Sequence, residues 1–166
     1  MLILARSLKE LRFGELMEIY AGSNRETAAR RYGDSDGFAL QEVEDDFRQY
    51  LWEVFFRTPG AVYALWEEDG RYVSALRLEP YRDGLILSAL ETSPEERGRG
   101  YATQLIQNVQ SVIRNLRTNV LYSHVNKRNR ISLNIHIRCG FCVISNYATY
   151  LDGSVDDRSY TLLYEC

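Results

Sequence analysis

Three short apolar segments between residues 61 and 92, each ended by a tight turn, constrain the fold of this chain most. "AVYALWEEDG" and "RYVSALRLEP" are separated by a Glu-Asp-Gly turn, which is the pattern of a β-hairpin. A second turn, "YRDG", leads into "LILSALET", a segment apolar enough to be a central strand. Strands joined by tight turns lie side by side, so the middle of the chain predicts a β-sheet.

The N-terminal third predicts one strand and two helices. "MLILA" reads as a strand, and apolar residues from Leu8 to Ile19 fit one loosely amphipathic helix. Residues 21–41 are polar and punctuated by glycine, which predicts a loop with at most a short helical turn. Apolar residues then recur at helical spacing from Val43 to Phe55, so a second helix is expected to end near "RTPG".

The C-terminal half predicts a helix over Ala102–Leu116, a strand at "NVLYSHV", and two strands joined by a polar turn in the tail. No repeat, linker or low-complexity segment divides the sequence, and 166 residues suffice for one buried core. We therefore expect a single α/β domain over residues 1–166.

Charge and hydropathy argue against several classes of protein. The formal net charge of −3 speaks against a general nucleic-acid binder, which normally carries a dominant basic face. No apolar run approaches the roughly 18 residues of a membrane span, and the apolar start is too short for a secretory signal. Three cysteines cannot all pair within one chain. A cytoplasmic protein with no membrane or nucleic-acid partner is expected.

The stretch "SPEERGRGYATQLI", Ser93 to Ile106, joins the last central strand to a helix through two arginines that alternate with two glycines. A helix start offers unpaired N–H groups and the positive end of the helix dipole, and glycine lets an anion approach them closely. This is the chemistry of a pyrophosphate site. The dinucleotide pattern G-x-G-x-x-G lacks its third glycine here, and Gly-Tyr-Ala replaces the G-K-S/T of a P-loop.

The loop resembles the acyl-CoA pyrophosphate loop of the GNAT superfamily of N-acyltransferases, R/Q-x-x-G-x-G/A. Arg97, Gly100 and Ala102 occupy its fixed positions, and a Pro-Glu pair precedes it. A later segment, "VNKRNRISLNIHIRCGF", is similar to the family motif N-x-x-A/S-x-x-x-Y-x-x-x-G-F through four residues. They are Asn129, Ser132, Gly140 and Phe141. The resemblance extends from about residue 61 to the end of the chain.

The resemblance implies a mixed, mostly antiparallel central sheet, splayed between its fourth and fifth strands, with helices on both faces. It also implies acetyl transfer from acetyl-CoA to a small-molecule or peptide amine, without a metal, and it leaves room for a homodimer through the C-terminal strands. The implied cofactor-binding residues are Leu90, Glu91, Thr92, Arg97, Gly98, Arg99, Gly100, Tyr101, Ala102, Thr103, Asn129 and Ser132. A binding domain that holds acyl-CoA without turnover is the main alternative.

Local pattern and resemblance disagree over Ile131–Arg138. Its strict alternation of apolar and polar residues is typical of a strand, whereas the resemblance implies a helix. Asn129 suits an N-cap and Gly140 suits a helix stop. We therefore predict a helix.

The catalytic residues are the least determined part of the site. His136 stands where the family motif has the tyrosine that in many relatives protonates the CoA thiolate, and an imidazole can do this work. It can equally be a packing residue or mark lost activity. Many relatives carry a glutamate base on the fourth strand, and Glu91 is the nearest carboxylate here, although strand alternation can turn it away. A water relay would need no dedicated base.

Other polar groups have both a functional and a structural interpretation. The run Lys127, Arg128 and Arg130 either meets the 3′-phosphate of CoA or is a solvated face. Acidic residues between positions 34 and 46 either attract a cationic amine or are merely solvated. Three tyrosines, at positions 32, 50 and 81, are candidates for a substrate pocket. The "CGFC" pair closes a helix rather than opening one, which argues against thiol redox chemistry, and it supplies too few ligands for zinc.

Overall fold

The computed structural model describes residues 1–165 and is built around a seven-stranded sheet. Among these residues β4 and β5 pair in parallel and every other pair in the sheet is antiparallel, as the resemblance implied. In spatial order the strands are β1 (Leu2–Ala5), β2 (Val62–Glu68), β3 (Arg71–Tyr81), β4 (Gly84–Thr92), β5 (Val120–Asn126), β9 (Ser159–Glu165) and β6 (Cys142–Ser145).

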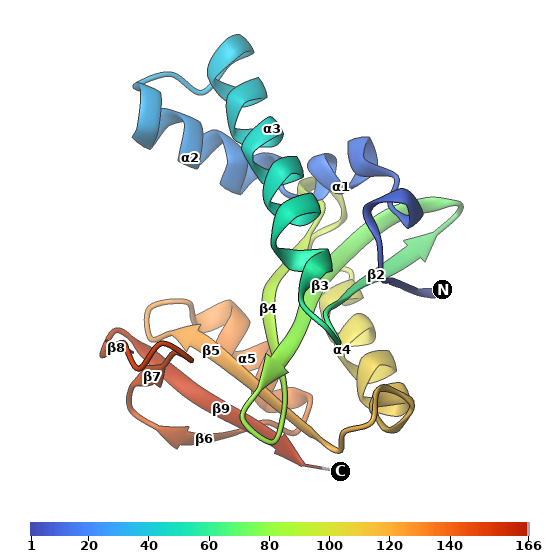
Figure 1. Ribbon diagram of the computed structural model, residues 1–166, viewed down its shortest axis with the longest axis vertical. Coiled ribbons are helices and arrows are strands. Elements are labelled where there is room, and N and C mark those ends of the chain that lie inside the picture. The colour runs from blue at the N-terminus through green and yellow to red at the C-terminus, as the bar shows by residue number, and fades with distance from the viewer. Residues whose placement is uncertain (166) are drawn as a thin grey trace.

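Helices cover both faces of the sheet, each over its own apolar core (Figure 1). One face carries α1 (Phe13–Ile19) and α3 (Gly37–Glu53), with α2 (Ala21–Tyr32) packed on α3. The other face carries α4 (Tyr101–Val112) and α5 (Arg130–Arg138). Short 3₁₀ turns are η1 (Leu8–Glu10), η2 (Phe55–Arg57), η3 (Pro94–Glu96) and η4 (Ile113–Leu116). No helix among the described residues is long and apolar enough to cross a membrane.

Two predictions for the N-terminal third were wrong. The single helix expected over Leu8–Ile19 is the turn η1 followed by α1, and the loop expected over residues 21–41 contains α2 and the first turn of α3. Ala28 is the one buried residue of α2, so this helix shows no apolar periodicity in the sequence. Good helix formers make it helical, and it ends where Gly33 adopts a left-handed φ of +70°.

The central hairpin and the disputed helix are both confirmed. Asp69 and Gly70 have positive φ angles of +48° and +77°, as the two-residue turn of a tight hairpin requires. Residues Arg130–Arg138 form α5, with the Asn129 Oδ1 atom accepting a hydrogen bond from the Ser132 N–H at 3.1 Å. Gly140 stops the helix at a φ of +85°. The capping residues therefore indicated the correct structure, a helix, where the alternating pattern indicated a strand.

The tail is more complex than two strands and a turn. Strands β6 and β9 are present, but β9 lies between β5 and β6. The connection between β6 and β9 contains a separate two-stranded hairpin of β7 (Ala148–Thr149) and β8 (Val155–Asp156). Strands of two residues are too short to leave an alternating pattern in the sequence.

The sheet opens between β4 and β5. Their parallel pairing covers Leu85–Leu87 against Leu121–Ser123 and then stops. At the same level β4 has a bulge, because Ala75 pairs with Glu91 while Arg77 pairs with Ser88, so that two steps along β3 oppose three along β4. The bulge turns the end of β4 away from β5, and this divergence positions the site described next.

Candidate active site

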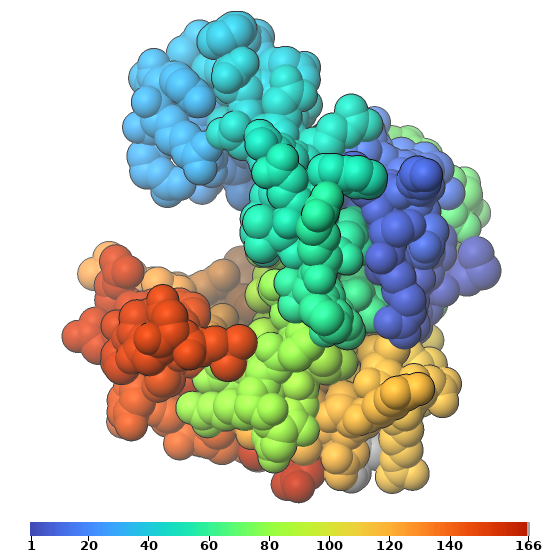
Figure 2. Space-filling view, viewed as in Figure 1, coloured from blue at the N-terminus to red at the C-terminus, as the bar shows by residue number. Residues whose placement is uncertain are grey.

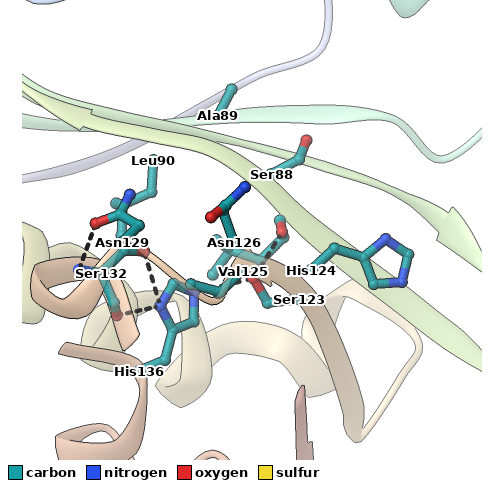
Figure 3. Close-up of a pocket in the computed structure, with 11 residues that line it drawn as sticks. Ser88, Ala89, Leu90, Ser123, His124, Val125, Asn126, Asn129, Ser132 and His136 are labelled. Atoms are coloured by element: carbon teal, nitrogen blue, oxygen red, sulfur yellow. Dashed lines mark hydrogen bonds between the residues drawn. The ribbon is translucent and has the colours of Figure 1, made fainter. Parts of the chain in front are cut away.

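A cavity of about 170 Å³ lies between the diverging ends of β4 and β5 (Figure 3). Strand β4 contributes four consecutive residues, strand β5 contributes four more, and the start of α5 closes one side. The lining residues are Leu87, Ser88, Ala89, Leu90, Ser123, His124, Val125, Asn126, Asn129, Ser132 and His136. Four of the predicted site residues are thus brought together here: Leu90, Asn129, Ser132 and His136.

The bulge of β4 is held by buried tyrosines. Ala89 has a φ of +52°, which an L-residue adopts only when its surroundings hold it there. The Tyr20 hydroxyl donates to the Ala89 carbonyl at 2.7 Å, and the Tyr63 hydroxyl lies 2.7 Å from that of Tyr20. Burial raises the pKa of both phenols well above the ordinary value, so both remain neutral donors. This chain fixes the backbone of β4 where it borders the cavity.

The glycine loop between η3 and α4 is open to an incoming anion. Gly98 and Gly100 have φ angles of +80° and +85°, and a Cβ added at either position would meet no atom within 4 Å. Gly100 is the N-cap of α4 and offers no side chain to the free N–H groups of the first turn, which begins at Tyr101. Ala102 and Thr103 continue this turn. The predicted cradle is therefore accessible.

The two loop arginines already have partners within the chain. The Arg97 Nε donates to the Thr92 carbonyl at 3.3 Å, and its Nη2 lies 3.6 Å from where a Cβ at Gly22 would stand. The Arg99 Nη1 pairs with a Glu96 carboxylate oxygen at 2.8 Å. Both side chains are exposed, so their charge stays near the loop while the backbone N–H groups remain the closest donors to an anion.

His136 is buried among hydrogen-bonding partners, with 1% of its surface exposed. Its Nδ1 lies 2.8 Å from the Ser132 carbonyl oxygen, and its Nε2 lies 3.0 Å from the Ser123 hydroxyl (Figure 3). A carbonyl only accepts, so Nδ1 carries the proton and Nε2 of the neutral ring is an acceptor. Burial lowers the pKa of His136, and the bond to Ser132 opposes this in part.

The Ser123 hydroxyl has one hydrogen and two acceptors, because the Leu87 carbonyl lies 3.1 Å away and the His136 Nε2 lies 3.0 Å away. With a neutral ring, only one of the two is satisfied. If His136 gains a second proton, Nε2 donates to Ser123, and Ser123 donates to Leu87. The network thus accommodates both protonation states of the ring.

Glu91 and Thr92 lie further along β4, outside the cavity lining. Burial raises the pKa of Glu91, against the lowering effect of Ser23 and of the Arg97 charge, so this carboxylate faces α2. The Thr92 hydroxyl lies 3.1 Å from that of Ser74. Neither side chain is part of the cavity that holds His136.

Strand β5 supplies three cavity residues that sequence reasoning missed: Ser123, His124 and Asn126. His124 points away from His136 (Figure 3), and its ring meets those of Tyr81 and Tyr150 edge to face. Burial lowers the pKa of His124, and the Arg82 charge adds to this. Polar residues in the second half of this strand, directly before the second motif, are the signal that was available.

The remaining candidates lie outside the cavity lining. Lys127 donates to the Asp157 carbonyl at 2.7 Å, while Arg128 and Arg130 are exposed. The acidic residues line the α2–α3 connection and the outer face of α3, and Figure 2 shows the surface hollowed between these helices and the β7–β8 segment. Cys139 and Cys142 are free thiols, and burial raises the pKa of Cys139, unlike a redox-active thiol. Within residues 1–165 no three His, Cys, Asp or Glu side chains gather as a metal site.

Comparison with solved structures shows the same fold in several acetyltransferases. The PaiA N-acetyltransferase of Thermoplasma acidophilum, crystallised with coenzyme A, has a TM-score of 0.70 at 13% identity, over 100% of this chain and 99% of that one. The ribosomal-protein-S18-alanine N-acetyltransferase of Escherichia coli has a TM-score of 0.61 at 14% identity, over 99% and 94%. A spermidine N-acetyltransferase chimera from Vibrio cholerae and hSSAT has a TM-score of 0.63 at 17% identity, over 99% and 95%.

At the level of sequence, the chain matches none of the curated proteins compared with it. The model of the acetyltransferase (GNAT) family matches residues 16–141, well over half of the chain. This range contains the glycine loop, the diverging strands and α5, so both motifs lie within the match. The chain therefore belongs to the GNAT acetyltransferase family.

Proposed function

We propose that this protein transfers an acetyl group from acetyl-CoA to a primary amine. The observation that supports this most is the open glycine loop that follows β4 directly, with the cavity where β4 leaves β5. Family membership supports acyl transfer, and the PaiA neighbour was crystallised with coenzyme A. The neighbours are named for acceptors as different as a ribosomal protein and spermidine, so they do not select the amine.

In this proposal the loop binds the diphosphate of CoA through the N–H groups around Gly98 and Gly100. Arg97 and Arg99 add positive charge nearby. The backbone of Leu90–Thr92, freed from pairing with β5, accompanies the pantetheine arm. Asn129 and Ser132 border the arm from the start of α5, where both line the cavity.

The chemistry requires no covalent intermediate with the protein. The amine nitrogen attacks the thioester carbonyl carbon, the C–S bond breaks, and the products are an amide and free CoA thiol. Charge that develops on the carbonyl oxygen is stabilised by a backbone N–H at the β4 bulge, which Tyr20 holds in place. Proximity and orientation supply most of the remaining rate.

The CoA sulfur takes up a proton as it leaves. We propose His136 as its donor, acting through the Ser123 hydroxyl, because the His136 Nε2 lies 3.0 Å from that oxygen and both residues line the cavity. Loss of a proton from Nε2 returns the ring to its neutral form, with the proton on Nδ1. The ring is then recharged from solvent, to which the base described next returns the proton that the amine loses.

Removal of the amine proton needs an acceptor on the side of the cavity away from His136. His124 is the better candidate than Glu91, because it lines the cavity and its lowered pKa keeps the ring neutral near pH 7. Glu91 lies outside the lining and would need a water molecule between. His124→Gln and Glu91→Gln separate these roles, since only loss of the base shifts the pH at which kcat/KM rises.

The proposal is tested by titration calorimetry with acetyl-CoA and by thiol release with a panel of primary amines. Binding with amine-dependent thiol release is the expected result. Binding without release for any amine favours the alternative, an acyl-CoA-binding domain without turnover. Absence of binding rejects both.

A further inference from the structure

Four side-chain atoms in residues 1–165 are buried with no hydrogen-bond partner: Arg77 Nε, Ser88 Oγ, His124 Nε2 and Glu96 Oε2. The Glu96 oxygen still has the Arg99 guanidinium at 2.8 Å. Native proteins pair the large majority of such atoms, so a local group of exceptions points to something that the chain alone does not supply.

The three other atoms lie on one face of the sheet; Ser88 and His124 line the cavity, and Arg77 lies outside its lining, on β3 beside Ser88. Arg77 packs under α3 and η2, and Ser88 is its register partner on β4. His124 meets the ring of Tyr81, which is four residues from Arg77 on the same strand and therefore on the same face. Ser88 and His124 both line the cavity, the first from β4 and the second from β5.

Arg77 is a half-buried cation packed against aromatic rings, with the Tyr50 hydroxyl as a hydrogen-bond partner and no paired carboxylate within residues 1–165. Its guanidinium carbon lies 5.2 Å from the ring centre of Tyr50, 5.8 Å from that of Phe55 and 6.0 Å from that of Phe47. Within the described chain no carboxylate oxygen lies within 4.0 Å of it, although Glu79 is on the same face of β3. Cation–π contacts offset only part of the cost of burying such a charge.

Ser88 stands beside Arg77 on the neighbouring strand, so their side chains are cross-strand neighbours. A guanidinium presents parallel N–H donors that match the two oxygens of a carboxylate, and a serine hydroxyl adds a third donor. The pair thus offers donors for one small planar anion, next to the cavity where an amine would meet the thioester.

We propose that Arg77 and Ser88 bind a carboxylate of the acceptor, so that the acceptor is an amino acid with its amine at the His124 wall of the cavity. This rests on the proposed function for the amine and adds the substrate class. A zwitterion also matches the charges around the site, where the Arg77 cation has the Glu79 carboxylate and the acidic α3 nearby.

Turnover of matched acceptors tests the proposal. The panel pairs glycine, β-alanine, γ-aminobutyrate and phenylalanine with their carboxamides, and adds 2-aminoethylphosphonate as an amine whose anion is not planar. We expect at least one amino acid to exceed its amide by roughly 10- to 100-fold in kcat/KM, the value of a charge-assisted hydrogen bond. Equal rates within every pair, or preference for the phosphonate, would overturn it.

The variant Arg77→Met, which keeps an unbranched side chain under the rings, is expected to remove this preference by raising KM for the acid alone. The variant Ser88→Ala is expected to weaken it by a smaller factor, with less risk to folding. Equal loss for acid and amide in both variants would assign Arg77 and Ser88 to structure instead.

Binding without turnover separates this proposal from the proposed function. We would titrate the same acids and amides into the wild-type protein with CoA present and follow binding by calorimetry. This measures the affinity of the carboxylate site whether or not acetyl transfer occurs. Binding of an acid that Arg77→Met abolishes supports the site even if no thiol is released. If thiol is released with amides as readily as with acids and no acid binds, acetyl transfer stands and the carboxylate site is rejected.

Discussion

The two walls of the cavity differ in how their polar groups are satisfied. On the α5 side, Asn129 caps the helix, and both nitrogens of His136 lie within hydrogen-bond distance of Ser132 and Ser123. On the α3 side, Arg77, Ser88 and His124 each keep a buried atom without a partner. The lining polar side chains on the α5 side all have a partner within hydrogen-bond distance and form what we call the complete wall; the α3 side, with its three unpaired atoms, is the incomplete wall.

Under the proposed function, this difference separates the binding of the two substrates. The cofactor side offers mainly backbone groups held in place by capping and by bulge geometry, so its own side chains can satisfy one another. The acceptor side has polar side chains whose cost of burial is offset only when a ligand arrives. In our proposal the incomplete wall is therefore where the variable substrate, the amine acceptor, binds.

The largest expected effect is a loss of kcat when His136, on the complete wall, is replaced. His136→Phe removes the proposed donor, and kcat should fall roughly 100-fold or more, the usual contribution of general acid catalysis. Affinity for acetyl-CoA, measured by calorimetry, should change little. Ser123→Ala is the matched control for the relay and should show a similar fall. A His136→Phe enzyme with wild-type kcat at neutral pH would remove the donor role.

The next effect concerns the loop. Gly100→Ala adds a methyl group at a φ of +85°, in the space an anion would use, so the affinity for CoA should fall roughly tenfold or more. Gly33→Ala is a matched control, because Gly33 has a similar φ of +70° with equally open surroundings. Both changes should cost about 1 kcal/mol in the free energy of unfolding, and only the first should weaken CoA. Equal affinities in calorimetry would contradict the cradle.

The complete wall was the more predictable one, because its signals are local in sequence. Asn129 and Gly140 lie at the two ends of one helix, and Gly98 and Gly100 lie in one loop, so two short motifs and the family resemblance that they carry predicted the helix and the loop. The helix α2 escaped prediction, since with only Ala28 buried it has no apolar stripe.

The incomplete wall was not predictable in the same way. Arg77, Ser88 and His124 come from three strands, and each local pattern indicates only a strand. The bond from Tyr20 to Ala89 joins residues 69 positions apart. Whether a buried polar atom has a partner is a property of the packed chain, which no single segment contains.

A smaller effect is expected from loss of the hydrogen bond that fixes the β4 backbone between the two walls. Tyr20→Phe deletes the hydroxyl that holds the Ala89 carbonyl, so the β4 backbone should lose its fixed direction. We expect kcat to fall roughly tenfold with CoA affinity kept, because one oriented donor contributes at least that much. Tyr63→Phe is the control, since it leaves the bond between Tyr20 and Ala89 intact. A fall in kcat for Tyr63→Phe as large as for Tyr20→Phe would show that the effect is only packing.

The smallest expected effect compares the two histidines through stability. Burial lowers the pKa of both His124 and His136, so each ring contributes stability above the unfolded pKa near 6.5. That contribution is lost as pH falls, because the unfolded chain takes up protons that the folded chain resists. Each histidine changes the free energy of unfolding by at most about 1.4 kcal/mol per pH unit.

Urea unfolding at pH 7.5 and pH 5.5 measures this contribution. Glu91, whose pKa is raised, acts in the opposite direction but is common to all variants and cancels between them. The loss of stability on acidification should be smaller in His136→Phe and in His124→Phe than in the wild type. His136 is the more deeply buried ring, so removing it should reduce the loss more. An unchanged loss in His136→Phe would mean that its network holds the charged ring as readily as the neutral one. In that case the folded chain protonates His136 as readily as the unfolded chain does, and the charged ring that the proposed donor requires forms at no cost to the fold.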